Sequence, residues 1–139
     1  MTSKYKVLFL CRENSARSII AEALLRELAG HRFEVFSAGV NPNRVRPEAI
    51  AVMQELGIDL SAHRSKHADE FVGQSFDYVL TVCDHAREVC PIFPGKTVTI
   101  HHSFVDPADF NGSEEERLAL FRKVREEIRE YLRTFPAKV

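Results

Sequence analysis

Short apolar runs alternate along the chain with longer segments of helical periodicity. The runs with the length of buried strands are residues 5–10, 33–37, 77–82 and 97–101. The helices predicted between and after them cover residues 16–29, 47–56, 84–90 and 114–135. Strands that alternate with helices are typical of a parallel sheet covered on both faces.

The helix ends carry recognisable signals. Gly30 stands where the first long helix should stop, and Pro47 is well placed to open the second. Ser113 and Glu116 have the spacing of a capping box at the start of the last helix. The apolar faces expected to pack are Ile19, Ile20, Ala23, Leu24 and Leu28 in the first helix and Leu120, Val124, Ile128 and Leu132 in the last.

We therefore expect an α/β fold, a three-layer doubly wound sandwich with a four-stranded parallel sheet of order 2-1-3-4, as a single domain over residues 1–139. In that order the topological switch lies between the first and third strands, and ligands bind beyond the carboxyl ends of the strands there. Cys11 directly follows the first strand, Cys83 follows the third, and Asp106 lies in the loop after the fourth. The fold thus brings these residues to one edge of the sheet.

Composition narrows the classes of function. The net charge is -1, which gives no basic footprint for nucleic acid. No apolar run reaches the ~18 residues of a membrane span, and the strand that starts near the N-terminus leaves no room for a secretory signal. The three cysteines are an odd number, which favours reactive thiols in a reducing, cytoplasmic setting over a disulfide framework.

The histidines do not indicate a metal site. His63 and His67 are four apart and His101 and His102 are adjacent, but neither pair has a cysteine or carboxylate at a recognisable zinc spacing. We expect no metal and no other cofactor.

The segment after the first strand has the features of an oxyanion loop. It joins a strand to a helix N-terminus, where backbone N–H groups and the helix dipole favour an anion. The Arg17 guanidinium matches a tetrahedral oxyanion, and the Cys11 thiolate would lie at the floor as nucleophile. A nucleotide-binding loop is excluded because no Gly-Lys-Ser/Thr follows. The residues expected around the oxyanion are Arg12, Glu13, Asn14, Ser15, Ala16, Arg17 and Ser18.

Three further residues are candidates with open alternatives. Asp106 precedes Pro107 and is either a general acid for a leaving oxygen or part of a solvated turn. Cys83 at the switch point favours a reactive thiol over a structural one. Cys90, seven residues further on, remains ambiguous from its position alone.

These residues together resemble a known family. The chain looks like a thioredoxin-coupled arsenate reductase built on the low-molecular-weight protein tyrosine phosphatase fold. The resemblance covers nearly the whole chain and rests on the Cys11-x5-Arg17-Ser18 loop, Ser37-Ala38-Gly39, Gly57-Ile58-Asp59-Leu60-Ser61, Asp106-Pro107, and Thr81-Val82-Cys83 with Cys90-Pro91.

The resemblance implies reduction of arsenate to arsenite through a relay of thiols. Cys11 attacks arsenate, held by Arg17 and the loop amides, with Asp106 as general acid. Cys83 attacks the Cys11–arsenic adduct, and arsenite leaves. Cys90 then attacks Cys83, and thioredoxin reduces the resulting disulfide. Ser18 would hydrogen-bond the Cys11 thiolate, and phosphate and sulfate would compete with arsenate.

The sequence also departs from the family pattern. Glu13 stands where the loop usually has glycine and Ala16 where it has cysteine, so we expect the Glu13 carboxylate to point to solvent. His63-Arg64-Ser65-Lys66 looks more like the phosphatase branch, and potassium-binding reductases have an acidic residue where Lys66 stands. The alternatives are therefore a tyrosine phosphatase that forms a phosphocysteine, or a non-enzymatic phosphocysteine carrier or anion-binding module.

Overall fold

Four parallel strands form the sheet of the computed structural model, which describes residues 4–14, 16–60, 63–83, 95–107 and 110–135. The strands are β1 (Tyr5–Cys11), β2 (Phe33–Gly39), β3 (Tyr78–Thr81) and β4 (Val98–His101). Their order is β2-β1-β3-β4, and every neighbouring pair is parallel. The predicted order 2-1-3-4 is confirmed.

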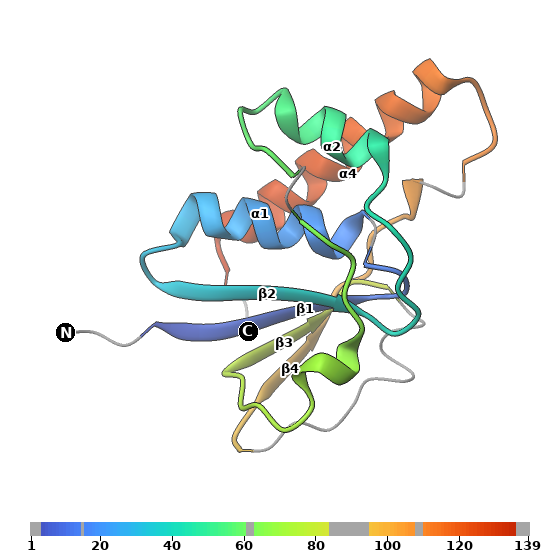
Figure 1. Ribbon diagram of the computed structural model, residues 1–139. Coiled ribbons are helices and arrows are strands. Elements are labelled where there is room, and N and C mark those ends of the chain that lie inside the picture. The colour runs from blue at the N-terminus through green and yellow to red at the C-terminus, as the bar shows by residue number, and fades with distance from the viewer. Residues whose placement is uncertain (1–3, 15, 61–62, 84–94, 108–109, 136–139) are drawn as a thin grey trace.

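Three helices lie on one face of this sheet (Figure 1). They are α1 (Arg17–Ala29), α2 (Pro47–Gln54) and α4 (Glu114–Arg133). α1 packs on β1 and β2, while α4 packs against both α1 and α2. The predicted helices 16–29, 47–56 and 114–135 are confirmed within a few residues at each end. The predicted helix 84–90 lies outside the described residues.

A one-turn 3₁₀ helix, η1 (Ala68–Phe71), lies on the opposite face and was not predicted (Figure 1). A segment this short has no periodicity to reveal it. Its Phe71 ring lies 5.7 Å from Phe36 and 6.0 Å from Phe76. This aromatic cluster helps cover the second face of the sheet.

The central strand β1 is buried on both faces. Residues 7–10 of this strand are at most 1% exposed, as expected for a parallel sheet between two layers. The buried residues of β1 hold the strand in place between the two layers. Cys11, the last residue of β1, therefore has a fixed position at the start of the loop.

Two details of the helix faces differ from the prediction. Leu28 is 40% exposed, because it lies in the last turn of α1, near the end of the layer. In α4 the fully buried aromatic residue is Phe121, while Leu120 is only partly buried. The capping box at Ser113 and Glu116 is present as predicted.

No helix in the described ranges has the length and apolar character that crossing a membrane requires.

Candidate active site

The loop between β1 and α1 turns its carbonyl groups outward. Cys11 O accepts from the Val40 amide at 3.1 Å, and Arg12 O accepts from the Asn41 amide at 2.7 Å. Glu13 O accepts from the amide of residue 43 and from the hydroxyl of residue 65. In a trans peptide the N–H points opposite to the C=O, so the amides of residues 12–14 point into the loop. This is the arrangement of an anion-binding nest.

Asn14 fixes the shape of this loop. It is fully buried with a φ of 51°, a left-handed conformation that asparagine tolerates better than most residues. Its Oδ1 accepts the Lys66 amide at 2.8 Å, which orients the side-chain amide. Its Nδ2 then donates to Ser18 Oγ at 2.7 Å and to Ser37 Oγ at 3.0 Å.

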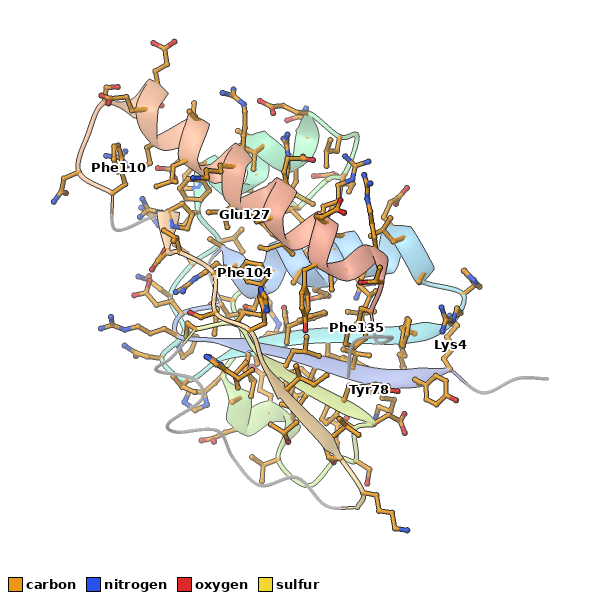
Figure 2. The ribbon with its side chains drawn as sticks, turned by 180° about the vertical axis from the view of Figure 1, so that it is seen from behind. Lys4, Tyr78, Phe104, Phe110, Glu127 and Phe135 are labelled. Carbon is orange, nitrogen blue, oxygen red and sulfur yellow. The ribbon has the colours of Figure 1, made fainter. Side chains whose placement is uncertain are left out.

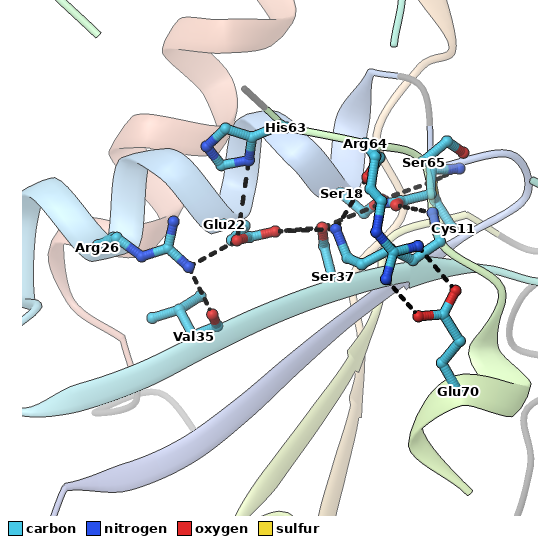
Figure 3. Close-up of polar contacts among 12 residues, drawn as sticks. Cys11, Ser18, Glu22, Arg26, Val35, Ser37, His63, Arg64, Ser65 and Glu70 are labelled. Carbon is cyan, nitrogen blue, oxygen red and sulfur yellow. Dashed lines mark hydrogen bonds and ion pairs between the residues drawn. The ribbon is translucent and has the colours of Figure 1, made fainter. Parts of the chain in front are cut away.

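The Cys11 sulfur lies on the floor of the loop, 2% exposed (Figure 3). The Asn14 amide donates to Cys11 Sγ at 3.1 Å, and Ser18 Oγ lies 2.9 Å from the sulfur. Since Ser18 Oγ already accepts from Asn14, its own proton is available to donate to the sulfur. Two hydrogen-bond donors therefore converge on the Cys11 sulfur.

The N-terminus of α1 faces the same loop. Ala16 occupies the N-cap, and no side chain of the described residues caps this helix end. The first turn contains no acidic residue. Its first N–H groups have no acceptor within the helix, so they and the helix dipole can bind an oxyanion.

Arg17 links this loop to the segment after β4. Its Nη1 donates to Phe104 O at 3.0 Å, and its Nη2 lies 3.3 Å from Asp106 Oδ2. These two contacts orient the guanidinium, which has five N–H donors in all. Asp106, whose position alone left a general acid and a solvated turn open, lies beside the loop and is partly exposed.

Gly39 permits the loop to lie against the end of β2. A Cβ atom at this position would come within 2.7 Å of both Asn14 N and Glu13 C. Real Cβ contacts are not this short, and the neighbouring atoms are backbone. The chain therefore needs glycine here because two backbones approach closely, not because of a special φ.

A buried carboxylate lies behind the loop and was missed by the sequence analysis (Figure 3). Glu22, 5% exposed, accepts a very short hydrogen bond from Ser37 Oγ, and Arg26 Nη2 lies 2.6 Å from its other oxygen. Glu22 follows Ser18 by four residues, so both lie on one face of α1. The available signal was the i,i+4 spacing of the polar residues Ser18, Glu22 and Arg26 within a largely apolar helix.

Two more basic groups surround Glu22. His63 Nδ1 and Lys66 Nζ each lie 3.9 Å from its oxygens. Burial lowers the pKa of Lys66, and the negative charge of Glu22 opposes that shift. The carboxylate is thus surrounded by cationic and titratable groups of the protein itself.

Of the other predicted site residues, the structure describes Cys83 but not Cys90 or Ser15. Cys83 lies two residues after the end of β3 and is buried. Because Val82 N donates to Leu10 O, Cys83 and Cys11 leave adjacent strands at the same edge. Cys90 and Ser15 lie outside the described residues.

Glu13 and Ala16 fit the loop in spite of their departure from the family pattern. Among the described non-glycine residues Asn14 alone has a positive φ, so position 13 does not require glycine. Glu13 is partly exposed and Ala16 is buried. Within the described part of the chain, no three histidine, cysteine or acidic side chains form a group that could hold a metal ion.

Comparison with known proteins identifies similar chains. The family model of the low molecular weight phosphotyrosine protein phosphatases matches residues 6–139. An arsenate reductase of Halalkalibacterium halodurans is 41% identical over 133 residues, which are 96% of each chain. The structure of an arsenate reductase in the oxidized state is 31% identical with a TM-score of 0.80, covering 96% of this chain and 97% of that one. A thioredoxin-dependent arsenate reductase of Corynebacterium glutamicum is 27% identical with a TM-score of 0.70, covering 99% of this chain and 65% of that one.

Proposed function

Because this chain belongs to the low molecular weight phosphotyrosine protein phosphatase family, we propose that it uses the family's oxyanion loop to reduce arsenate to arsenite. Full-length similarity to arsenate reductases supports this reaction. A thiol relay needs a reducing compartment, so we assign the enzyme to the cytoplasm and its role to arsenic detoxification.

In the first step the Cys11 thiolate attacks the arsenic atom of arsenate. The inward amides of the loop, the N-terminus of α1 and Arg17 hold the oxygens. Asp106, 3.3 Å from Arg17, gives a proton to the oxygen that leaves as water. The product is a covalent Cys11–arsenic(V) adduct.

In the second step Cys83 attacks the sulfur of Cys11. A Cys11–Cys83 disulfide forms and the sulfur–arsenic bond breaks. The electron pair of that bond stays on arsenic, which leaves as arsenite with the oxidation state lowered by two. The end of β3 brings Cys83 next to the strand that carries Cys11.

In the third step Cys90 attacks the sulfur of Cys83 and releases the Cys11 thiolate. The resulting Cys83–Cys90 disulfide is reduced by a dithiol protein, which we propose is thioredoxin by analogy with the Corynebacterium glutamicum relative. Peptide mapping after a single turnover tests this step. A terminal disulfide between Cys11 and Cys83 would exclude Cys90 from the relay.

The observation that carries the proposal is the second cysteine at the switch point of the sheet. Hydrolysis of a phosphomonoester needs a nucleophile, an oxyanion site and an acid, and Cys11, Arg17 and Asp106 suffice for that. Reduction of arsenic also needs a second thiol that can attack Cys11. Cys83 is the described residue that meets this requirement.

The second candidate is phosphomonoester hydrolysis through a phosphocysteine. Asp106, which lies 3.3 Å from Arg17, would serve this reaction too, because it can protonate a leaving alkoxide or phenoxide. We expect this activity as a side reaction of the same loop.

One pair of assays separates the two functions. We expect arsenate-dependent NADPH consumption in the presence of thioredoxin and its reductase, and slower hydrolysis of an aryl phosphate. Cys83→Ser should lose the first activity and keep the second, while Cys11→Ser should lose both. Arsenate reduction that survives in Cys83→Ser would overturn the relay.

A further inference from the structure

A groove separates the segment after β4 from the second half of α4. Its volume is about 500 Å³. Phe104 and Glu127 mark its two sides in Figure 2. The residues that line it are His102, Ser103, Phe104, Val105, Glu127, Glu130, Tyr131 and Thr134.

Aromatic rings form a continuous wall in this groove. The His102 ring stacks on Tyr131 with centroids 4.2 Å apart and an interplanar angle of 29°. Phe104 packs on His102 at 4.8 Å and meets Tyr131 edge-on at 6.0 Å. Val105 adds exposed apolar surface beside them. The three rings meet at interplanar angles of 29°, 51° and 79°, so they form an angled aromatic surface whose faces and edges can pack against a planar group.

The charge of the groove is acidic. Glu127 and Glu130 are both exposed and lie one helical turn apart on α4. Among the described residues no lysine or arginine lines the groove. Glu130 has a surface pair with Arg133 at 3.3 Å, whereas Glu127 forms no ion pair within the described part of the chain.

We propose that this groove binds an arginine side chain presented by a partner protein. A guanidinium is planar, stacks on aromatic surfaces and pairs with carboxylates in two parallel hydrogen bonds. A lysine ammonium is a more strongly hydrated point charge and would gain less from the aromatic wall. The aromatic wall and the acidic face of α4 together therefore favour arginine over lysine as the bound side chain.

The position of the groove places such a partner next to the active site. Phe104 lies on the groove wall, and its carbonyl oxygen accepts a hydrogen bond from Arg17 Nη1. Asp106, which lies 3.3 Å from Arg17 Nη2, follows two residues later. A protein that docks here lies beside the segment that carries Asp106. The inference does not depend on whether the loop reduces arsenate or hydrolyses phosphate esters.

A titration followed by two-dimensional NMR tests the proposal. The probe is the peptide acetyl-Gly-Arg-Gly-amide, added to the intact ¹⁵N-labelled protein. Its comparator replaces arginine by citrulline, which keeps the shape and removes the charge. We expect saturable shifts at residues 102–105 and 127–134 with the arginine peptide, and binding about ten-fold weaker with citrulline.

Variants separate the groove from general charge attraction. We expect Glu127→Gln/Glu130→Gln to weaken arginine-peptide binding about ten-fold, because two exposed carboxylates are removed. Glu115→Gln removes a charge from the same helix away from the groove and should bind the peptide as the unchanged protein does. Equal binding of the citrulline peptide, shifts centred outside the groove, or a double variant that binds normally would each overturn the proposal.

Discussion

At the residue scale, two hydrogen-bond donors surround the Cys11 sulfur. An amide donates to Cys11 Sγ, and the Ser18 hydroxyl lies at 2.9 Å with its proton available. A serine hydroxyl at the same place has no accessible anion at neutral pH. We expect Cys11→Ser to abolish arsenate turnover and to keep cooperative thermal unfolding. Coupled NADPH assays and calorimetry check this, and arsenate reduction that persists in the variant would rule out Cys11 as nucleophile.

Gly39 does not contact the reacting atoms, but its lack of a side chain lets the loop of Cys11 lie close to the end of β2. In Gly39→Ala the new methyl group meets the backbone of Asn14 and Glu13 at 2.7 Å, so the loop must move. We expect kcat/KM to fall on the order of 100-fold, because small displacements of the reacting groups are costly. We also expect a loss of about 1–3 kcal/mol in the free energy of unfolding.

The matched control for this change is Gly57→Ala. Gly57 has a φ of +77° and open space around it, so alanine there strains the backbone without touching the loop. We expect a cost of about 1 kcal/mol in unfolding free energy and an unchanged kcat/KM. An active Gly39→Ala enzyme would show that the loop can be displaced without loss.

Lys66 determines the expected response to potassium. Its ammonium lies 3.9 Å from the buried Glu22 carboxylate. By the sequence resemblance described above, potassium-binding reductases would have an acidic residue at this position. The protein therefore supplies a cation of its own there. We expect equal turnover in matched potassium and tetramethylammonium salts. A specific rise of several-fold in potassium would contradict this role of Lys66.

At the scale of elements, α4 has a local cap at its N-terminus and a tertiary contact with the end of α2. Ser113 Oγ accepts from Glu116 N at 3.1 Å, and the Glu116 carboxylate accepts from Ser113 N at 3.2 Å. Further along α4, Arg125 Nη1 donates to Val52 O and to Glu55 Oε1, each at 2.8 Å, which joins α4 to α2.

We expect Ser113→Ala to lower the free energy of unfolding by about 1 kcal/mol, because the first turn of α4 loses an acceptor. The site is formed by other elements, so kcat/KM should stay unchanged. Urea unfolding and steady-state assays on the same preparation test both statements. A fall in kcat/KM at full folding would show that the start of α4 is coupled to the site.

At the scale of the whole molecule, oxyanion binding couples the site to folding. The loop between β1 and α1 packs against the segments after β2 and β4. An anion bound in this loop should therefore stabilise β1, α1 and both segments together. Phosphate shares the charge and tetrahedral shape of arsenate, and we expect it and sulfate to compete in initial-rate assays.

The same binding should raise thermal stability. At 100 times its dissociation constant, phosphate should raise Tm by about 5–10 °C, as mass action and the size of the domain predict. Arg17→Ala should lose most of this shift, since it removes the charged fork of the site. A full shift in that variant would place the anion elsewhere.

The sequence by itself determined the parts of this protein that depend on near neighbours. Apolar runs, helical periodicity and capping residues predicted the strands and three of the helices, because these signals act within a few residues. The loop between β1 and α1 could be singled out for the same reason, since Cys11, Arg17 and Ser18 lie within one short segment. The sheet order followed from the doubly wound fold class that the alternation of strands and helices indicates. The brief η1 was missed because one turn carries no periodicity.

Only the tertiary structure decided how distant segments complete the site. The contact of Arg17 with Phe104 O spans 87 residues, and that of the Lys66 amide with Asn14 spans 52. The burial of Glu22, the close approach at Gly39 and the choice of Asp106 as a neighbour of Arg17 depend on the same packing. Such contacts follow from where β1, β2 and β4 end in space, and no local pattern of residues encodes those distances.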